Sequence, residues 1–438
     1  MKKILSVILV LSLCFGIASC SSNYKKNSIA PAGHKINIDY SALKQDGYKG
    51  FLERLDLFAA KLTHEVYSEG NTQSNVCISP VSVYMALAIA AECASGETRD
   101  EILNAVGVTY DEVNDFTKIL YAYANRSFKY TDRLGSNKIL AFEELANSLW
   151  ADKDLALKKS AVDGIADNYN CDIFGVNFEN GEGEKAIGNY IKDKTHGIID
   201  GDINLSPKTL ITIINTFYLK EVWNEFGDKL SFTDNAYDFK NADGSITNTK
   251  LLRGYYFNGN VCEGDGFTSF YTKTEHGFEI KFIVPTGDST LEKVFTPENI
   301  YAINNIDDYG YIDEENKLLH HTRAFFPEYT ASFDGDISKI LKDEFDINKL
   351  FNIEECDFSS ITDEDVACDG VIHKCSLEVN ARGIEGAAVT VMPMAGDPGP
   401  LEGYEKVYHD YIVDRAFGFV ITDNCGTVLF SGAVNNVQ

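Results

Sequence analysis

The chain has 438 residues, with 66 Asp and Glu against 39 Lys and Arg, which gives a formal net charge of −27. This acidity argues against a nucleic-acid partner, because a phosphate backbone is bound by a basic surface, and against binding to anionic membrane surfaces. A hydrophobic fraction of 44% and an aromatic fraction of 12% exclude an extended disordered chain, and the length suffices to bury a large core without disulfide bonds.

Residues 1–19 are predicted to be a signal peptide for export. Lys2 and Lys3 precede the apolar run Ile4–Leu13, which is too short to span a bilayer, and a small-residue cleavage site follows. The ending Ile-Ala-Ser-Cys resembles the lipobox of bacterial lipoproteins, which implies that Cys20 is acylated and becomes the mature N-terminus. An ordinary signal peptide is the alternative. The protein is therefore expected to be exported, either as a cell-surface lipoprotein or as a secreted, extracellular protein.

Residues 20–49 are predicted to be a polar tether, and residues 50–438 a single globular domain. No later segment has the roughly 18 uninterrupted apolar residues that a transmembrane helix needs. No break in composition and no internal repeat divides the domain. We expect a monomer that contacts the membrane only through its lipid.

The cysteines lack the spacing of a metal or redox site. Cys14 and Cys20 belong to the export signal, and no CxxC pair occurs among the others, so zinc ribbons and thioredoxin-type chemistry lack their pattern. Cys77, Cys93 and Cys375 lie inside apolar runs, where a small buried thiol is favoured. How the eight cysteines of the mature chain pair, if they pair at all, stays open.

Hydrophobic periodicity predicts helices mainly in the first part of the domain and strands mainly in the second. Apolar residues at three- and four-residue spacing predict a helix over Phe51–Leu62, and Ser79-Pro80 is typical of a helix start before the buried helix Val81–Ala91. The other predicted elements are the strand Asn75–Ile78, the helix Thr98–Val106, the buried strands Leu145–Trp150 and Leu210–Leu219, the strand Phe278–Val284 and the hairpin Phe417–Thr422 with Thr427–Val434. This succession predicts an α+β fold.

A search for catalytic motifs is negative. GxSxG, HExxH, the P-loop and a strand-turn-helix GxGxxG are all absent from the sequence. Asn241–Gly244 lacks the ligand series of a calcium loop and is interpreted as a turn between strands. The adjacent His320 and His321 would point to opposite sides of a strand. The search favours a protein that is not an enzyme, although a hydrolase could still assemble a catalytic triad from scattered residues, and it predicts neither a metal nor another cofactor.

Many stretches of the chain, in order from about residue 51 to the end, resemble the serpins, the serine-protease-inhibitor family. The most specific are Ser79-Pro80-x-Ser82, Asn147-Ser148-Leu149-Trp150, Ile214–Lys220 with Trp223, Glu378–Ala388, and Asp414-Arg415-Ala416-Phe417-x-Phe419. The resemblance implies the serpin fold, with a large central β-sheet, additional sheets, about nine helices and an exposed reactive-centre loop at about residues 381–406. It further implies that this loop enters the sheet as an extra strand after cleavage.

The resemblance places the hinge of this loop at Gly383, Ile384, Glu385, Gly386, Ala387, Ala388, Val389 and Thr390. Side chains alternate between the two faces of a strand, so Ile384, Gly386, Ala388 and Thr390 share a face that carries no charge and can turn toward a core. The opposite face holds the single charge of Glu385, which stays in solvent. The hinge is therefore chemically suited to insertion, although Ile384 stands where inhibitory members usually have Thr or Ser.

The resemblance also implies a polar cluster and a tryptophan that control how the sheet opens. The family positions beneath the opening region of the sheet are matched here by Ser79, Ser82, Asn215 and His373. These residues either form a buried cluster whose hydrogen bonds are satisfied or exchange hydrogen bonds as the strands separate. Both interpretations hold if the hydrogen bonds of the cluster are satisfied in two arrangements. Trp223 matches the position where the loop enters. Glu221 replaces the glycine that the family usually has two residues earlier, and the sequence offers no reason for it.

The bond that a protease would cut is placed by counting along the loop. Counting from the hinge puts the scissile residue near Asp397, so the candidate region is Met394, Ala395, Gly396 and Asp397. Most serine proteases cut poorly before a proline such as Pro398, whereas the Met394-Ala395 and Ala395-Gly396 bonds suit an elastase-like pocket. Counting back from Ala416-Phe417 puts it near Glu405, and the nearby Leu401 and Tyr404 suit chymotrypsin-like enzymes, while Lys406 suits a trypsin-like enzyme.

The function expected from the resemblance is inhibition of serine proteases. The protein would act as a suicide substrate, through cleavage of the loop, covalent trapping of the acyl-enzyme and insertion of the loop into the central sheet. Elastase-like targets are favoured. The alternatives are a non-inhibitory binding module on the same fold and an inhibitor of papain-like cysteine proteases.

Overall fold

The computed structural model describes residues 23–32, 46–70, 72–131, 137–224, 229–255, 261–304, 312–313, 316–384 and 404–437. Nine α-helices are found within this part of the chain. They are α1 (Asp46–Ser68), α2 (Pro80–Cys93), α3 (Gly96–Val106), α4 (Tyr110–Tyr123), α5 (Lys159–Asn168), α6 (Glu182–Lys194), α7 (Leu291–Val294), α8 (Pro297–Asn304) and α9 (Ser338–Asp343). Two short 3-10 helices, η1 (Asn23–Asn27) and η3 (Lys349–Phe351), accompany them.

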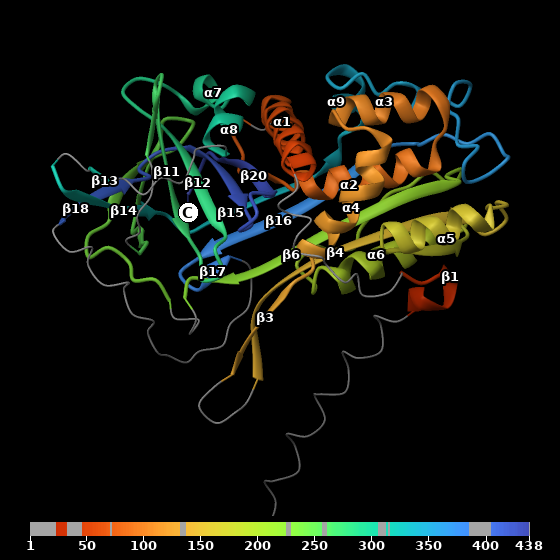
Figure 1. The fold of residues 1–438 in the computed structure, drawn as a ribbon, viewed down its shortest axis with the longest axis horizontal. Coiled ribbons are helices and arrows are strands. Elements are labelled where there is room, and N and C mark those ends of the chain that lie inside the picture. Colours follow the sequence, from red (N-terminus) through yellow and green to blue (C-terminus); the bar gives the residue numbers. More distant parts are fainter. Residues whose placement is uncertain are drawn as a thin grey trace, which may run out of the picture.

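The largest sheet has eight strands and runs across the molecule (Figure 1). Its strands follow the spatial order β1-β5-β4-β6-β17-β16-β15, with β3 paired to β4. Their bounds are β1 Ser28–Ala30, β3 Ser127–Thr131, β4 Asn137–Asp152, β5 Cys171–Val176, β6 Ile211–Val222, β15 Tyr329–Asp336, β16 Ile372–Asn380 and β17 Gly383–Ile384. The predicted buried strands around residues 145 and 210 are thus two long neighbours, β4 and β6, in the central sheet.

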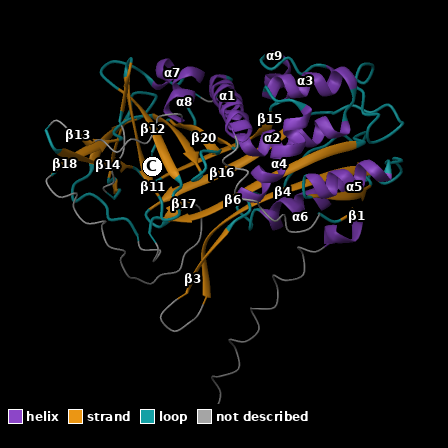
Figure 2. Ribbon diagram, viewed as in Figure 1, coloured by secondary structure: helices purple, strands orange, loops and turns teal. Residues whose placement is uncertain are grey.

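Three smaller sheets complete the fold, and Figure 2 shows how strands and helices divide between the two ends of the molecule. A six-stranded sheet has the order β10 (Cys262–Gly264), β11 (Phe267–Lys273), β12 (Glu279–Pro285), β19 (Phe417–Thr422), β20 (Val428–Val434) and β2 (Val76–Ile78). A four-stranded sheet contains β13 (Ile312–Asp313), β14 (Leu318–Phe326), β18 (Glu405–Ile412) and β9 (Leu252–Arg253), and β7 (Tyr237–Lys240) pairs with β8 (Ile246–Thr249). The predicted α+β class and the C-terminal hairpin are confirmed.

Strands β5 and β6 of the central sheet are largely buried on both faces, which explains why they are apolar runs, whereas β15 and β16 alternate between buried and more exposed residues. On β4, Leu145 and Leu149 face the main core together with α1 and α2. Ala146 and Trp150 face a second core cluster, which includes α6. The alternation follows the two-residue period of a strand. The two faces of β4 thus contact α2 on one side and α6 on the other.

Part of the segment that we expected to be a tether, residues 20–49, instead packs on the domain. The short strand β1 pairs antiparallel with β5 at the edge of the central sheet, and η1 precedes it. Tyr24 is 3% exposed and packs edge-on against Phe174 and Tyr190, with ring centroids 5.7 and 5.4 Å away. Its hydroxyl donates a 2.6 Å hydrogen bond to Asp193 on α6. Aromatic burial therefore holds residues 23–32 against the sheet edge, and helix α1 starts at residue 46, before the expected domain boundary.

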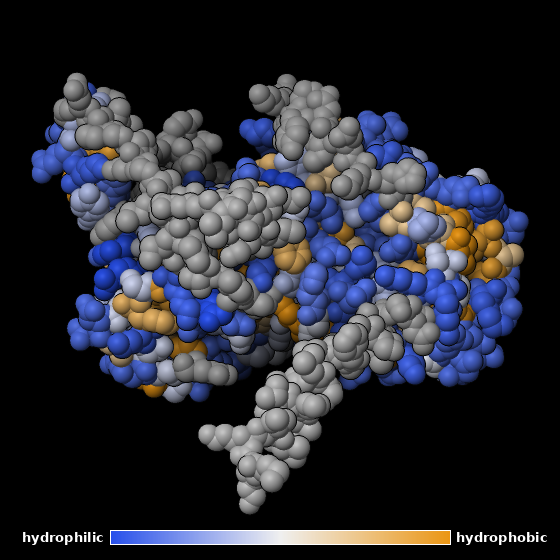
Figure 3. All heavy atoms as spheres, turned by 90° about the horizontal axis from the view of Figure 1, so that it is seen from below, coloured by the Kyte–Doolittle hydropathy of each residue, from blue (hydrophilic) through white to orange (hydrophobic). Residues whose placement is uncertain are grey.

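The molecular surface is mostly hydrophilic on the face seen in Figure 3, as the acidic composition leads one to expect. Hydrophobic side chains gather at one end of that face, the end that carries α5 and β1 in Figure 1. Ile29 of β1 is among the exposed large hydrophobic residues.

Replacing Tyr24 with alanine is expected to release the N-terminal segment. Removal of a buried aromatic ring costs about 3 kcal/mol, which exceeds the roughly 0.5–1.5 kcal/mol that ten residues contribute on average to net stability. Trypsin should then cut the folded protein faster after the exposed Lys25 and Lys26, as followed by mass spectrometry under native conditions. Tyr24→Phe is the matched control, because it keeps the ring and loses only the hydrogen bond to Asp193. Equal cleavage rates in Tyr24→Ala and in the unchanged protein would show that the ring does not hold the segment.

Candidate functional site

The hinge enters the central sheet between β6 and β16. Ile384 pairs antiparallel with Val379 of β16 and with Glu221 of β6, and Gly383 pairs with the next residue of each strand. β17 is only two residues long, whereas β6 spans twelve. Among the described residues no ladder joins β6 to β16 directly, so β17 alone bridges the two strands. The arrangement is that of a sheet with one strand position filled only at its end.

The identities of the two residues of β17 follow from their surroundings in the sheet. At Gly383 a Cβ atom would lie 1.9 Å from the carbonyl oxygen of Glu221, so the close approach of the two strands requires glycine. Ile384 is 1% exposed and packs into the main core, on the face that we expected to turn inward. The remaining predicted hinge residues, 385–390, and the candidate scissile residues, 394–397, lie outside the described part of the chain.

Trp223 closes the end of the sheet where β17 enters. Its indole Nε1 donates a 2.8 Å hydrogen bond to the carbonyl oxygen of Asn380, at the end of β16. Its ring packs against Phe326, with centroids 5.6 Å apart. The side chain is thus held between the ends of β6 and β16, beside the first residue of β17; because Gly383 pairs with Val222 and Ile384 with Glu221, a lengthening β17 strand would run along β6 away from Trp223.

Glu221, which the sequence left unexplained, has specific partners in the structure. Its carboxylate accepts a 2.8 Å hydrogen bond from the backbone N–H of Val222 and lies 2.9 Å from Nδ1 of His276. His276 comes from the turn between β11 and β12, and Phe128 stacks on its ring with centroids 4.1 Å apart. The carboxylate therefore ties the end of the central sheet to the second sheet. Sequence reasoning missed His276, which is 55 positions away.

Two further carboxyl groups, Glu143 and Asp423, are buried near Glu221 around a single arginine. The Nε atom of Arg126 donates to Glu143 at 2.8 Å, and its guanidinium lies 3.5 Å from Asp423. Burial raises the pKa of all three carboxyl groups above the usual range, that of Glu143 to about 8, although the charge of Arg126 acts in the opposite direction. One arginine and the imidazole of His276 thus face three carboxyl groups.

The four residues of the predicted polar cluster are brought together at the start of α2, as two pairs. The backbone N–H of Ser79 donates a 3.1 Å hydrogen bond to Nε2 of His373, which lies on β16. The hydroxyl of Ser82 donates to the side-chain oxygen of Asn215, which lies on β6. The start of α2 therefore contacts both strands between which the hinge enters. The buried hydroxyl of Ser79 has no hydrogen-bond partner within the described residues.

The β6 side of this cluster continues through a residue that sequence reasoning did not assign to it. The side-chain amide of Asn215 donates to Asn147 on β4, which in turn donates to the carbonyl oxygen of Tyr169 at 2.7 Å. The hydroxyl of Tyr190 on α6 donates to the carbonyl oxygen of Asn147 at 3.2 Å. A hydrogen-bonded chain thus joins α2, β6, β4 and α6. The signal was present, because Asn147 opens the Asn-Ser-Leu-Trp motif.

His373 is neutral in this arrangement. Its Nε2 accepts a hydrogen bond, so in the neutral ring the proton resides on Nδ1. Burial in the core lowers the pKa of His373 to about 4, because the charged imidazolium loses its solvation there. A change that exposes this ring to water therefore favours its protonation at mildly acidic pH.

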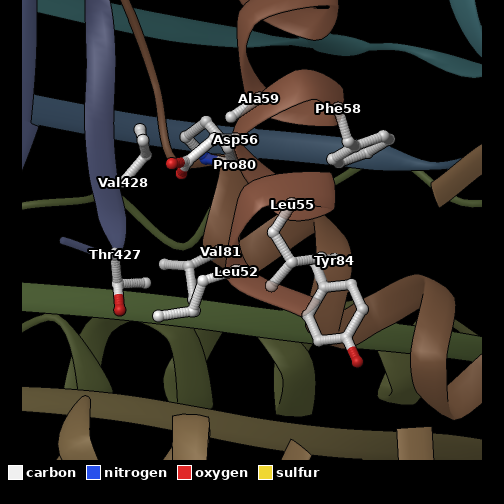
Figure 4. Close-up of a pocket in the computed structure, with 10 residues that line it drawn as sticks. All are labelled: Leu52, Leu55, Asp56, Phe58, Ala59, Pro80, Val81, Tyr84, Thr427 and Val428. Carbon is white, nitrogen blue, oxygen red and sulfur yellow. The ribbon is translucent and has the colours of Figure 1, made fainter. Parts of the chain in front are cut away.

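A small cavity beside α1 does not add to this site. It is lined by Leu52, Leu55, Asp56, Phe58, Ala59, Pro80, Val81, Tyr84, Thr427 and Val428 (Figure 4). Its volume of about 10 Å³ has room for about one water molecule. The hydroxyl of Thr427 has no hydrogen-bond partner within the described residues, so the cavity suits one bound water better than a substrate.

Neither a metal site nor a membrane span is found in the described part of the chain. No group of three or more His, Cys, Asp and Glu side chains is placed to hold a metal ion there. None of the helices found there is both long and apolar enough to cross a bilayer.

The fold has a large central sheet in which, among the described residues, only β17 bridges β6 and β16. The profile of the family described as serpin (serine protease inhibitor) matches residues 53–437. The chain therefore belongs to the serpin family. This confirms the family and the fold that the sequence motifs indicated.

Relatives of known sequence and structure agree with this assignment. Iripin-4 of Ixodes ricinus is 26% identical over 394 residues, which cover 87% of this chain and 93% of the relative. Serpin-Z1C of Triticum aestivum is 26% identical over 398 residues, 86% and 94% of the two chains. The structure of Serpin48 from the insect Tenebrio molitor superposes with a TM-score of 0.71 at 18% identity, covering 89% of this chain and 99% of the other. The native state of tengpin, a thermophilic serpin, gives 0.68 at 22% identity, with 95% and 99% covered.

Serpins in general inhibit proteases, and nothing in the described structure indicates catalytic activity. The same fold also serves another purpose. Human thyroxine-binding globulin, whose structure was determined with its hormone, superposes with a TM-score of 0.68 at 18% identity, covering 89% of this chain and 99% of the other. The fold alone therefore does not distinguish an inhibitor from a binding protein.

Proposed function

We propose that this serpin inhibits serine proteases as a suicide substrate. The protease cuts the reactive-centre loop and forms an acyl-enzyme, the loop then inserts between β6 and β16, and the protease is carried along before it can deacylate. The observation that carries the proposal is the two-residue strand β17, which pairs with both neighbours and is the only strand between β6 and β16 within the described residues. Insertion only has to extend a strand that has begun.

The energy available from this extension is sufficient for the proposed mechanism. About 15 inserted residues at roughly 3.3 Å each would move an attached protease by about 50 Å. With a net ~0.5–1.5 kcal/mol per backbone hydrogen bond, the new ladder contributes on the order of 10 kcal/mol. β6 spans twelve residues, of which β17 pairs with two, so most of its edge is available to the incoming strand.

The polar cluster supports the proposal because its contacts divide between the two sides that must separate. Ser79 contacts His373 on the β16 side, and Ser82 contacts Asn215 on the β6 side. The unpaired hydroxyl of Ser79 gives the cluster a donor that can be used once the strands have moved. A cluster that only stabilised a closed sheet would be expected to have this hydroxyl satisfied.

The proposed targets are elastase-like proteases, because Met394, Ala395 and Gly396 offer small and medium apolar residues at the distance from the hinge that insertion requires. Chymotrypsin-like enzymes are the second choice. The proposal also places the protein outside the cell, attached through a lipid on Cys20 or released. Incorporation of a labelled fatty acid that is lost in Cys20→Ala checks the attachment.

The test is incubation of the protein with elastase-, chymotrypsin-, trypsin- and papain-like proteases in turn. Inhibition by this mechanism gives a complex that survives denaturing electrophoresis and a released C-terminal fragment, whose mass identifies the cut bond. A denaturant-stable complex with the papain-like enzyme alone would move the target to the cysteine proteases. Cleavage that leaves every protease active and does not raise the thermal stability of the cleaved protein would instead indicate a non-inhibitory binding module.

A further inference from the structure

Two cysteines meet directly behind the polar cluster, although 298 positions separate them in the chain. The sulfur atoms of Cys77 on β2 and Cys375 on β16 lie 3.4 Å apart. Both side chains are buried, with 0% and 5% of their surface exposed. From the sequence we expected a small buried thiol at each position and left the pairing open. In the structure they are a pair, and both are reduced.

The cysteine pair and the Ser79–His373 hydrogen bond connect the same two segments of the chain. Ser79 follows Cys77 by two residues, and His373 precedes Cys375 by two, so the segments run in opposite directions with two matched contacts. β2 belongs to the six-stranded sheet, where it pairs with β20, whereas β16 belongs to the central sheet. The cysteines therefore join the two main sheets at one point, next to the residues that control opening.

We propose that Cys77 and Cys375 form a disulfide bond in the exported protein. The inference rests on the proposed export, because an oxidising compartment favours such a bond. An S–S bond is about 2.05 Å long, so the sulfur atoms must approach by about 1.4 Å, within the reach of side-chain rotation. The bond would close a very long loop, the case in which a cross-link most restricts the unfolded chain.

The reaction is thiol–disulfide exchange with a disulfide oxidant. The thiolate of one cysteine attacks the oxidant's disulfide, which releases one oxidant sulfur as a thiolate and leaves a mixed disulfide. The second cysteine, after losing its proton, attacks the mixed disulfide, forms the Cys77–Cys375 bond and releases the second oxidant sulfur. The two cysteines together lose two protons and two electrons, and the oxidant's disulfide is reduced to thiols.

This exchange takes place during folding rather than afterwards. In the folded protein neither sulfur is accessible to an oxidant, and burial raises the pKa of the Cys77 thiol well above its usual value, which suppresses the reactive thiolate. Once formed, the bond is equally protected from reductants. We therefore expect a permanent structural bond, set when the protein folds, and not a reversible switch on the native surface.

The bond would decide which part of the molecule moves when the loop inserts. It fixes β16 to β2, and hence to the six-stranded sheet, on one side of the vacant position. On the other side β6 is paired with β4 over ten residues and joined to α6 through Asn147. The sheet would therefore open by displacement of β6, β4 and α6 together, with β16 stationary, and the bond would leave inhibition intact.

The test uses the full chain, refolded from denaturant either with reduced and oxidised glutathione or with a reductant. Free thiols are alkylated in denaturant, and unreduced peptides are analysed by mass spectrometry. We expect the peptides containing Cys77 and Cys375 to be linked after oxidative refolding. Two alkylated thiols at these positions at every glutathione ratio, or a link from either residue to another cysteine, would overturn the proposal. Neither result depends on export or on protease inhibition.

Stability measurements with matched variants separate the bond from packing effects. The oxidatively refolded protein should melt at a higher temperature than the reductively refolded one, and this difference should vanish in Cys77→Ala, in Cys375→Ala and in the double variant alike. Cys93→Ala, which removes a buried cysteine elsewhere in the core, should keep the difference. A redox-dependent difference that persists in Cys77→Ala would contradict the assignment even if all variants fold.

Discussion

Replacing Ile384 with glutamate is expected to convert the protein from an inhibitor into a substrate. The side chain is 1% exposed, and its strand pairs Ile384 with Glu221, itself a buried carboxyl group. A second carboxyl group directly opposite the first is destabilising, and burying a charge without a partner costs several kcal/mol. We expect the glutamate to leave the sheet in the uncleaved variant, so that insertion must bury it again; if this step costs about 3 kcal/mol, insertion slows about 100-fold. Deacylation then becomes faster than insertion, so the denaturant-stable complex should nearly disappear while the loop is still cut.

The controls for this change keep the position apolar or neutral. Ile384→Met preserves volume and hydrophobicity, and Ile384→Thr introduces the type of residue that inhibitory family members usually have there. Both should retain most of the complex, measured as moles of protein consumed per mole of protease inactivated. An Ile384→Glu variant with an unchanged ratio would show that β17 does not lie on the insertion path, and it would remove the observation on which the proposed function depends.

Acidification is expected to favour opening of the sheet through His373. The pKa of this buried histidine is lowered to about 4 in the closed structure and is about 6.5 when the ring is exposed. A histidine with a depressed pKa stabilises the closed state above pH 6.5, and this contribution is lost as the pH falls from 6.5 toward 4. The loss reaches about 3 kcal/mol, which corresponds to roughly a 100-fold increase in the open population.

The experiment compares the rate at which inhibitory activity is lost at a fixed temperature between pH 7 and pH 4. The three carboxyl groups with raised pKa values, Glu143, Glu221 and Asp423, act in the opposite direction, because they favour the folded state when protonated. The relevant quantity is therefore the difference between the unchanged protein and His373→Asn, which cannot titrate. The unchanged protein should lose activity increasingly faster than the variant as the pH falls. Parallel profiles would assign the acid sensitivity to other groups.

The structure also shows how local sequence patterns led to correct predictions. The apolar run Val81–Ala91 predicts a helix buried on all sides, and α2 spans Pro80–Cys93 in the core. The apolar run over residues 210–219 predicts a buried strand, and β6 spans Ile211–Val222 with both faces covered. In each case the spacing of apolar residues indicates how many faces of the helix or strand are buried, and this spacing is encoded within a short stretch of the chain.

Other features were missed because they depend on contacts between distant segments. Residues 23–32 are polar enough to suggest a free tether, yet Tyr24 packs against rings from β5 and α6. Glu221 breaks the family pattern, and its reason is His276, which comes from a different sheet. In both cases a single side chain finds its partner only after the elements have packed.

The amino-acid sequence by itself determined several of the elements, the serpin family, the uncharged face of the hinge and the absence of a known catalytic motif, because these follow from local periodicity and from short motifs. The tertiary structure decided which groups share an environment. It divided Ser79, Ser82, Asn215 and His373 into two pairs on opposite sides of the vacant strand position, and it brought Cys77 to Cys375. These contacts arise where two sheets and a helix cross, and the crossing is set by packing of the whole core, which no short stretch of sequence encodes.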